Sequence, residues 1–311
     1  MGVPMNTKEH ARFVLPIMRR EWDMAMQNPR LASPAFRFMG IDGSGSSVEY
    51  SQGLGNFGLV PEYNSADAEG NPGAIAYDSF SDLYETTFTH KEYALGTSIE
   101  RKILDDDQRG LIRRKAQNLG FAFGRTRATH ASSVFNNAFS ASYVGADAVA
   151  LCSALHPVNK SSSTTYSNAG STALSYDAVV TTIIAGHDLN DDRGNPMQSI
   201  YDVLYVPTGL QATAYEITKA LNKPGTADND ANFLNSAGLQ VVVDPYLSDA
   251  NNWFMIDSGM ARMHLLWFNR VLPEFALSDQ SQFELRADYR GYMRYSFGWD
   301  DARWVYGHEV S

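Results

Sequence analysis

The clearest alternation of apolar and polar positions lies near the C-terminus, in the stretch FELRADYRGYMRYSFGW at residues 283–299. Its odd positions are apolar, aromatic or small, and its even positions are mostly charged or polar. Strict alternation predicts a β-strand with one buried face. These seventeen residues would reach on the order of 55 Å at roughly 3.3 Å each, whereas an ordinary strand has about 5–6 residues. We therefore expect an unusually long strand with a charged outer face.

A second periodic stretch predicts one long helix over about residues 106–140. Apolar residues recur there at spacings of three and four, which is the pattern of a helix with one buried face. Three aspartates at 105–107 are expected to cap its N-terminus and to favour its dipole. Gly120 and Gly124 each cost about 1 kcal/mol relative to Ala. The helix therefore needs tertiary packing, and the glycines would permit close approach of another backbone.

Short apolar runs alternate with helical patterns in the segment between these two elements. Helices are predicted at 176–188 and 210–221, and strands at 202–207, 239–245 and 253–257. Short, continuous apolar runs are typical of strands that are buried on both faces. We expect a compact α/β or α+β unit whose sheet is covered on both sides.

The N-terminal part of the chain predicts extensions rather than a core. Residues 1–40 contain a short helical pattern that prolines interrupt, so we expect an extended or partly helical arm. Residues 41–82 are rich in Gly, Ser and Asn and hold short alternating pieces, which predicts a long hairpin. Such a hairpin has too few apolar residues to fold alone. The alternating segment at 83–100 is expected to be a single strand that leads back from it.

Composition is that of a globular protein, and the charge is unevenly distributed. Of the 311 residues, 19% are charged and 12% aromatic, and the net charge is −10, which argues against a free nucleic-acid binder. No Lys or Arg occurs from residue 38 to residue 90, whereas residues 101–127 carry eight. Solvated surface would explain either run alone. An acidic arm followed by a basic segment also suggests complementary surfaces between copies of the chain.

The sequence also bears on the compartment. The single Cys152 excludes a disulfide framework. No run of 18 or more apolar residues exists, so we expect no membrane span. The N-terminus lacks the apolar core of a signal peptide. We expect a soluble protein made in a cytoplasm.

No motif argues for catalysis or for a metal site. The segment 187–195 resembles a calcium loop, but Arg193 and Ser199 stand where an EF-hand needs Gly and Glu, so we expect a polar turn. Cys152 and His156 could serve as nucleophile and base. No third member or oxyanion hole accompanies them, and the structural interpretation is preferred. We predict no enzyme, no cofactor and no bound metal.

Taken in order, these segments resemble the major capsid protein of tailed bacteriophages, the shell fold shared with encapsulins. The resemblance covers nearly the whole chain from about residue 40. It rests on ETTFTHKEYALGTSIERKILDDD, DRGNPMQSIYDVLYVPTGLQATAYEI, LQVVVDPYLSDANNWFMID and FELRADYRGYMRYSFGWDDARWVYG. These look like that family's extended-loop strand and spine helix, the strands and helix of its axial domain, and its long peripheral strand.

The resemblance implies an α+β phage major-capsid fold with four parts. They are an N-terminal arm at 1–40, an extended loop (E-loop) at 41–90, a peripheral domain at 91–170 and 262–300 with a spine helix at about 106–140, and an axial α/β domain at 171–261 and 301–311. In this fold the long strand is the beam of a flat shell tile, and the hairpin lies over an adjacent subunit.

The implied function is structural. The chain would self-assemble as hexamers and pentamers into an icosahedral head around packaged double-stranded DNA. It would belong to the virion and assemble in the cytoplasm of a bacterial host. The implied partners are other copies of the chain, a portal and a scaffolding protein, a decoration protein, and DNA by non-specific proximity, with no membrane.

Our inference from the charges adds a contact between copies. Acidic residues near the hairpin tip of one copy should meet basic residues on the spine helix of the next: Glu62, Asp67 and Glu69 against Arg113, Arg114 and Lys115. Exposed ion pairs are worth about 0–1 kcal/mol each. They would fix the register, while buried apolar area supplies most of the binding.

The sequence departs from the family pattern in two ways. Some relatives cross-link through a Lys on the extended loop, but the hairpin has none before Lys91, so that chemistry is not expected. About forty residues precede the loop, too few for a cleaved scaffolding segment, so we expect a separate scaffolding protein.

Two alternative functions remain. An encapsulin-type compartment is the alternative with the same fold. A carbohydrate-acting hydrolase or lectin that uses the aromatic strand is the alternative from another class.

Overall fold

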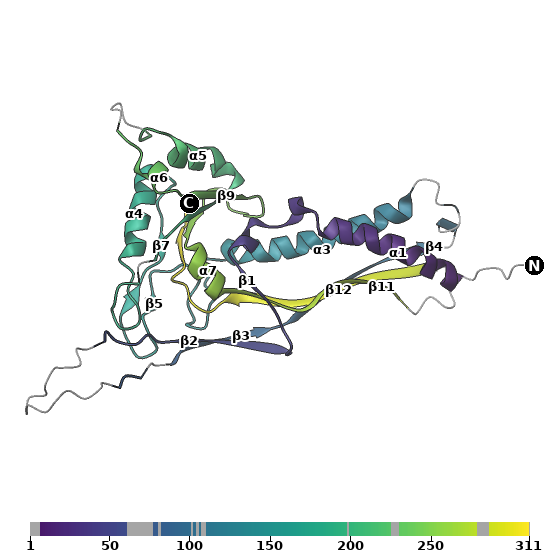
Figure 1. Cartoon of the computed structure of the whole chain (residues 1–311), viewed down its shortest axis with the longest axis horizontal. Coiled ribbons are helices and arrows are strands. Elements are labelled where there is room, and N and C mark those ends of the chain that lie inside the picture. Colours follow the sequence, from purple (N-terminus) through teal and green to yellow (C-terminus); the bar gives the residue numbers. More distant parts are fainter. Residues whose placement is uncertain are drawn as a thin grey trace, which may run out of the picture.

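The structure is a computed structural model that describes residues 7–60, 77–79, 82–100, 102–103, 106, 110–197, 199–224, 230–278 and 286–310. Figure 1 shows a long limb and a broader unit at one end, with the hairpin extending beneath that unit. A four-stranded sheet runs along the limb, and a five-stranded sheet lies in the broader unit.

The strands form these two sheets and two short ribbons. The four-stranded sheet contains β1 (Gly40–Gly43), β11 (Leu265–Leu277), β12 (Arg286–Trp299) and β4 (Lys91–Glu100), in that order. The five-stranded sheet contains β7 (Ala169–Gly170), β13 (Val305–His308), β10 (Trp253–Ile256), β8 (Val203–Pro207) and β9 (Gln240–Asp244). The ribbons pair β2 (Val48–Leu54) with β3 (Asp82–Thr89), and β5 (His156–Pro157) with β6 (Thr165–Tyr166).

Helices cover the sheets. The α-helices are α1 (Thr7–Met26), α3 (Leu111–Asn136), α4 (Tyr176–His187), α5 (Gln211–Lys219), α6 (Phe233–Ser236) and α7 (Ser258–His264). The 3₁₀ helices are η1 (Pro29–Leu31), η2 (Pro34–Arg37) and η3 (Thr208–Leu210).

Strand β12 confirms the alternation predicted near the C-terminus. Its fourteen described residues would span roughly 46 Å at about 3.3 Å each, while Phe283 and Leu285 lie outside the described residues. It is hydrogen-bonded on one side to β11 and on the other to β4, both antiparallel. One face of the strand buries Ala287, Tyr289, Gly291, Met293 and Tyr295.

Helices α1 and α3 pack side by side on that buried face (Figure 1), which we call the helix face. The ring of Trp22 on α1 lies 6.0 Å from Phe123 of α3 and 5.9 Å from Phe275 of β11. A Cβ at Gly291 of β12 would lie 2.6 Å from the Phe123 ring, so α3 rests directly on the strand. Both helices therefore share one core with the four-stranded sheet.

The predicted arm is more ordered than expected. We anticipated an extended or partly helical segment, whereas α1 is a continuous helix of 20 residues that includes Pro16. An interior proline costs about 3 kcal/mol in a helix. Burial of Val14, Met18 and Trp22 against α3 and the four-stranded sheet offsets that cost.

The predicted start of α3 was wrong. The helix begins at Leu111, and its N-cap is Gly110 with a φ of 65°. That left-handed residue turns the chain just before the helix, so no acidic side chain lies in the first turn and no side chain caps it. Asp106 therefore precedes the turn instead of capping the helix, while Asp105 and Asp107 lie outside the described residues.

Gly120 allows the predicted close approach of another backbone, and the partner is α1. A Cβ at Gly120 would lie 2.8 Å from both the Ala25 Cβ and the Trp22 carbonyl oxygen. At Gly124 the nearest atom would be Leu31 Cδ1 at 3.4 Å. Of these two glycines, only Gly120 must lack a side chain for the helices to pack this closely.

We expect Gly120→Ala to lower the free energy of unfolding by about 1–3 kcal/mol, because the added methyl group would push α1 away from α3. Gly124→Ala is the matched control, and it should be neutral or stabilise by up to about 1 kcal/mol through helix propensity. Urea unfolding curves of both variants measure the difference. Equal stabilities would contradict the close approach of the two helices.

The alternation of strands and helices predicted for the middle of the chain is confirmed in the five-stranded sheet. All five residues of β8 are buried. Its Val203 and Tyr205 belong to the core shared with α3, while Leu204 and Val206 belong to a second core with α4 and α5. The sheet is thus covered on both faces, which explains the continuous apolar run.

The ribbon of β2 and β3 lies on the other face of the four-stranded sheet, which we call the hairpin face. Phe88 of β3 is buried there, 5.2 Å from the ring of Phe268, and it would contact a Cβ at Gly298 at 3.0 Å. This cover also buries Ser296 and Gly298, so the alternation of β12 ends after Tyr295.

The single strand predicted at 83–100 is two strands in different layers. The break is at His90, which is buried between β3 and β4. Its ring nitrogens lie 2.8 Å from Ser44 Oγ and 3.0 Å from Ser296 Oγ. Here the chain leaves the ribbon and enters the four-stranded sheet.

Candidate functional site

The hairpin is held at its root, residues 55–60 and 77–79, by a polar turn of the broader unit. The N–H and Nδ2 groups of Asn56 donate to Asp192 Oδ1 at 3.0 and 3.1 Å. Arg193 donates to the Ser79 carbonyl oxygen at 2.6 Å, and its guanidinium lies 3.1 Å from Asp78 Oδ2. These contacts fix the direction in which the hairpin leaves the body.

The turn that provides these groups is the segment 187–195, and the prediction of a polar turn is confirmed. The Asp191 carboxylate accepts bonds from the backbone N–H groups of Arg193 and Asn195, at 2.9 and 2.7 Å, and from Asn195 Nδ2 at 3.1 Å. Its role in holding the hairpin was missed, because Asp78 and Arg193 are 115 residues apart and no local pattern links them.

At its root, the hairpin exposes apolar side chains. Leu59, Val60 and Tyr77 expose 83%, 95% and 94% of their surface. Exposed apolar groups that lie together indicate contact with a partner. The predicted contact residues of the tip, Glu62, Asp67 and Glu69, lie outside the described residues.

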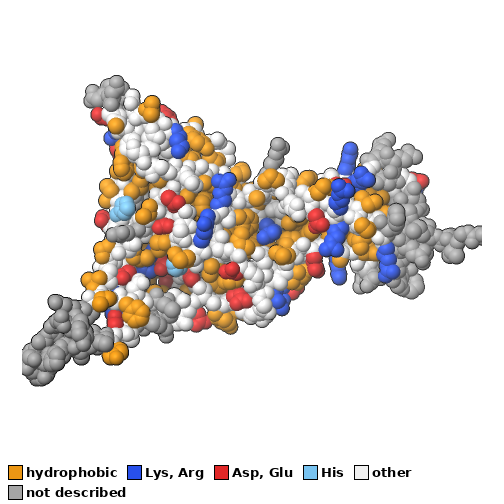
Figure 2. Space-filling view, in the orientation of Figure 1, with side chains coloured by type: hydrophobic (Ala, Val, Ile, Leu, Met, Phe, Trp, Pro, Cys, Tyr) orange, Lys and Arg blue, Asp and Glu red, His pale blue; other side chains and the backbone are white. Residues whose placement is uncertain are grey.

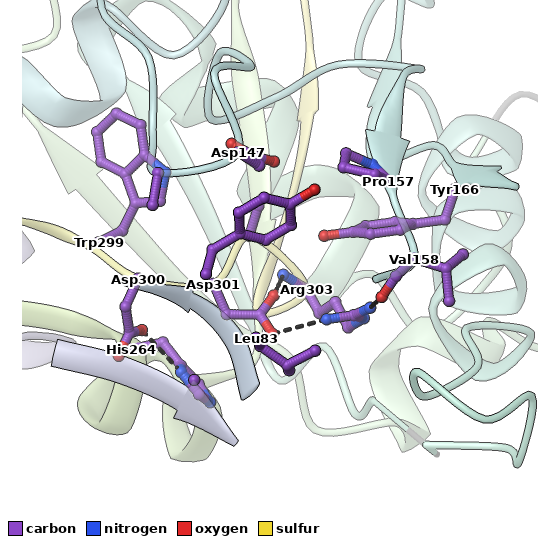
Figure 3. A pocket seen from close by; sticks show the side chains of 14 residues that line it. Leu83, Asp147, Pro157, Val158, Tyr166, His264, Trp299, Asp300, Asp301 and Arg303 are labelled. Atoms are coloured by element: carbon purple, nitrogen blue, oxygen red, sulfur yellow. Dashed lines mark hydrogen bonds and ion pairs between the residues drawn. The ribbon is translucent and has the colours of Figure 1, made fainter. Parts of the chain in front are cut away.

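A small cavity of about 100 Å³ lies where the hairpin, the end of β12 and the broader unit meet. Figure 3 shows the side chains that line it, with the Asp301–Arg303 pair at its centre. Arg303 Nη1 lies 2.8 Å from Asp301 Oδ2, and Nη2 donates to the Val158 carbonyl oxygen at 3.0 Å. The guanidinium also lies 4.7 Å from the Tyr166 ring.

Charge pairing governs the protonation of this cluster. Burial by itself would raise the pKa of Asp301, but the positive charge of Arg303 and its N–H donors bring that pKa below the ordinary value. Burial lowers the pKa of His264, but the hydrogen bond and charge of Asp300 more than compensate and raise it. Asp301 is therefore held in an ion pair with Arg303, and Asp300 is held by its hydrogen bond with His264.

The cavity is a structural joint. Asp300 Oδ2 also accepts a bond from Ser51 Oγ of the hairpin at 2.6 Å, so the cluster ties the hairpin to the sheet. A retaining or inverting glycosidase needs one carboxylic acid and one free carboxylate across a substrate cleft. Among the residues that line this cavity, Asp300 interacts with His264 and Asp301 with Arg303. These two carboxylates therefore do not provide the pair that a glycosidase needs, and the cavity does not support the hydrolase alternative.

Cys152 and His156 do not form a catalytic pair. Cys152 is wholly buried, and that burial raises the pKa of its thiol, so the reactive thiolate is disfavoured. His156 places Nδ1 2.7 Å from Asp147 Oδ2 and Nε2 3.2 Å from the Leu151 carbonyl oxygen. Both ring nitrogens are thus engaged by groups other than the thiol, as the structural interpretation expects.

A buried carboxyl group joins the five-stranded sheet to α3 and to the arm. Asp244 of β9 has no exposed surface, and its Oδ2 accepts bonds from Ser33 Oγ at 3.1 Å, Ser132 Oγ at 2.5 Å and the Tyr205 hydroxyl. Burial, followed by the neighbouring Asp244, raises the pKa of Tyr205, which keeps that hydroxyl a donor. The arm, α3 and the five-stranded sheet meet at this one oxygen, and no sequence motif signals it.

The predicted basic residues of the spine helix are divided between two roles. Arg113 and Arg114 are exposed on α3. Lys115 instead donates to the Ser98 carbonyl oxygen of β4 at 3.0 Å, so it serves the fold of its own chain. Figure 2 shows Lys and Arg side chains gathered over the limb where α1 and α3 lie. The pairing of these residues with the hairpin tip stays a prediction.

Within the part of the chain that the structure describes, no helix has both the length and the apolarity to cross a bilayer. In the same described residues, no three His, Cys, Asp or Glu side chains converge as a metal site requires.

Solved structures share this architecture. The chain is similar to one from Microbacterium phage Oxtober96 (TM-score 0.54, 11% identity, 90% of this chain and 91% of that one). It is similar to the capsid of Cyanophage P-SCSP1u (TM-score 0.59, 10% identity, 90% of this chain and 88% of that one). A third match is the bacteriophage JBD30 capsid decorated with minor capsid protein trimers (TM-score 0.52, 16% identity, 71% of this chain and 94% of that one). At these identities the likeness shows the fold.

The family match is independent of these structures. No curated protein matches the chain. Residues 84–307, well over half of the sequence, match the family described as phage capsid protein, and this segment includes α3, both principal sheets except β1, and the joint around Asp301. The chain therefore belongs to the phage capsid protein family, and it is a structural protein of the phage capsid rather than an enzyme.

Proposed function

We propose that the chain is the repeated shell subunit of a tailed-phage head, built as hexamers and pentamers around packaged double-stranded DNA. The observation that supports this is the hairpin, which leaves the body with Leu59, Val60 and Tyr77 exposed. At about 25 cal/mol per Å², burying them against another copy would favour assembly. The long sheet provides the flat tile from which such a shell is made.

The division into domains follows from the same proposal. The arm (1–40) contains α1, which packs on the spine helix α3. The extended loop (41–90) contains the ribbon of β2 and β3 and the hairpin root. The peripheral domain (91–170 and 262–300) would contain the limb, and the axial domain (171–261 and 301–311) most of the broader unit, to which β7 also belongs as a strand of the five-stranded sheet. The two cores support this division, and Asp244 would hold its two main parts together.

Other partners are inferred by analogy. The JBD30 capsid is decorated with minor capsid protein trimers. By analogy, we propose that a decoration protein also binds the head that this chain forms. A portal and a separate scaffolding protein complete the proposal. An encapsulin-type compartment would use the same fold, but the family match is to phage capsid proteins.

The contact between Glu62, Asp67 and Glu69 of one copy and the spine helix of the next remains part of the proposal. The hairpin and the helices lie on opposite faces of the four-stranded sheet. Pairing with Arg113 or Arg114 therefore requires the tip to pass around the edge of the neighbouring tile.

Expression of the chain alone tests the function. We expect negative-stain microscopy to show rings or closed shells, and light scattering to give masses of many subunits. A protein that stays monomeric across micromolar concentrations, with or without a co-expressed scaffolding protein, would contradict a shell subunit. Glycan cleavage or glycan binding by that monomer would favour the carbohydrate-acting alternative.

A further inference from the structure

We propose that His90 is a pH-sensitive latch: its neutral ring holds the ribbon of β2 and β3 on the four-stranded sheet, and protonation of the ring loosens that ribbon. Such a latch lets the hairpin change direction while the body of the subunit stays folded. The contacts that form it lie within one chain, so only its use in a shell rests on the proposed function.

His90 lies where the chain crosses between two layers, with the ribbon beneath the four-stranded sheet (Figure 1). Thr89 is the last residue of β3 in the ribbon, and Lys91 is the first residue of β4 in the sheet. A second crossing, from β1 to β2, contains Ser44. The His90 ring contacts Ser44 at this second crossing and Ser296 of β12. One side chain therefore ties both crossings to the sheet.

The hydrogen bonds assign the proton to one nitrogen of the ring. The Ser44 hydroxyl donates to Glu49 Oε1 at 2.5 Å, so its oxygen accepts a bond from the Nε2–H of His90 at 2.8 Å. A neutral imidazole has one donor and one acceptor. Nδ1 therefore accepts a bond from the Ser296 hydroxyl at 3.0 Å, and the neutral ring satisfies both serines.

A second proton on the ring would disturb this arrangement. It would turn Nδ1 from an acceptor into a donor, so that the Ser296 hydroxyl could no longer donate to it. The His90 side chain is also buried, with 5% of the residue exposed, and a buried site disfavours the charged form of histidine.

The charged groups that face the ring add to this effect. They are Arg294 of β12, Arg270 of β11 and Glu49 of β2, and Glu92 of β4 lies 3.8 Å from Arg294. Burial lowers the pKa of His90, and the charge of Arg294 lowers it further. Glu49 opposes this shift, and Arg270 contributes to it. Positive neighbours thus reinforce what burial imposes.

The direction of the pH effect follows from these contacts. A histidine whose pKa is lower in the latched state than in the released state binds fewer protons when latched, so acid favours release. The latch holds fully above the ordinary histidine pKa of about 6.5 and weakens as the pH falls from there towards the pKa of the latched ring. Each pH unit in that interval can weaken latching by up to about tenfold.

Two other anchors of the hairpin respond differently to acid. Burial lowers the pKa of His264, but the hydrogen bond and charge of Asp300 raise it overall, so acidification favours that pair. At the root, the backbone N–H of Gly58 is the main cause that lowers the pKa of Asp78, so this carboxylate keeps its charge in mild acid. Loosening in mild acid is therefore expected at His90 rather than at these anchors.

Hydrogen exchange tests the latch in full-length subunits that size exclusion separates from any shells. Protection factors, which correct for the intrinsic pH dependence of exchange, are measured between about pH 5 and pH 7.5, on either side of the ordinary histidine pKa. We expect protection of β2 and β3 to fall by up to about tenfold per pH unit below about pH 6.5. Protection of β12 should stay constant, because local opening leaves the core intact.

His90→Gln removes the titrating ring and keeps a side-chain N–H that can donate to Ser44. Its ribbon should be equally protected across the whole pH range. His187→Gln is the matched control, since His187 is exposed in the last turn of α4. The control should keep the wild-type dependence on pH.

Two charge variants test the latch with His90 in place. Arg294→Gln removes a positive charge that faces the ring, so it should reduce the loss of protection in acid. Glu49→Gln keeps an acceptor for the Ser44 hydroxyl but removes the facing negative charge, so it should enlarge that loss. A residue with a merely structural role would change protection equally at every pH.

Protection of the ribbon that does not depend on pH in the wild type would overturn the inference, as would an acid effect that His90→Gln retains. A parallel loss of protection in β12 would also overturn it, because acid would then unfold the whole subunit. A chain that never assembles would contradict the proposed function alone, since the latch is measured within single subunits.

Discussion

Replacing residues 61–76 with a short Gly-Ser linker between Val60 and Tyr77 will leave a folded subunit that no longer forms stable shells. The joint around Asp300 and the root contacts of Asn56 and Arg193 remain intact, so the body should melt at its usual temperature. What is lost is the part of the hairpin to which the proposed function assigns the contact with another copy. Microscopy and size-exclusion chromatography with light scattering measure the outcome.

The control for this deletion keeps the hairpin and changes an ion pair elsewhere on the surface. Lys223→Ala removes a contact of 3.2 Å to Asp177, which is an exposed pair worth about 0–1 kcal/mol, and it should assemble normally. Shells of normal stability from the deletion variant would refute the assignment of the hairpin as an extended loop.

Asp244→Ala should lower the free energy of unfolding by about 3 kcal/mol or more. It leaves the hydroxyl groups of Ser33, Ser132 and Tyr205 without their common acceptor, and each unsatisfied buried group costs about 1–3 kcal/mol. Because these donors come from the arm, α3 and β8, the variant should also loosen α3 and the arm relative to the five-stranded sheet. Urea unfolding measures the first effect, and hydrogen exchange at β8 and α3 the second.

Asp249→Ala is the matched control for the buried carboxyl. Asp249 also accepts two backbone N–H bonds, from Asn251 and Asn252, but in an exposed turn. Its removal should cost less than about 1 kcal/mol, as surface substitutions usually do. Similar losses in the two variants would show that the network at Asp244 has no special importance.

Elements with a strong local period could be predicted from the sequence. The alternation of β12, the apolar stripe of α3 and the continuous apolar run of β8 each reflect which side chains one element must bury. Such a requirement repeats every two or three to four residues, so it is visible within a short window. The turn at 187–195 was predictable for a similar reason, since its hydrogen bonds are local.

Boundaries and joints could not be predicted in the same way. The break at His90 exists because Ser44 and Ser296 meet its ring, and α3 starts late because of the left-handed Gly110. Helix α1 continues through Pro16 because α3 and the sheet cover it. Each outcome depends on residues that the chain brings together from a distance.

The sequence by itself determined the fold class, the family resemblance and the presence of a hairpin that cannot be stable alone, because these follow from periodicity and composition. Only the tertiary structure decided that Arg193 holds the hairpin root, that Asp244 joins the five-stranded sheet to α3 and the arm, and that hairpin and helices occupy opposite faces. Ser33 and Asp244 are 211 residues apart. Contacts over such separations depend on how whole layers pack, and no local pattern of side chains specifies them.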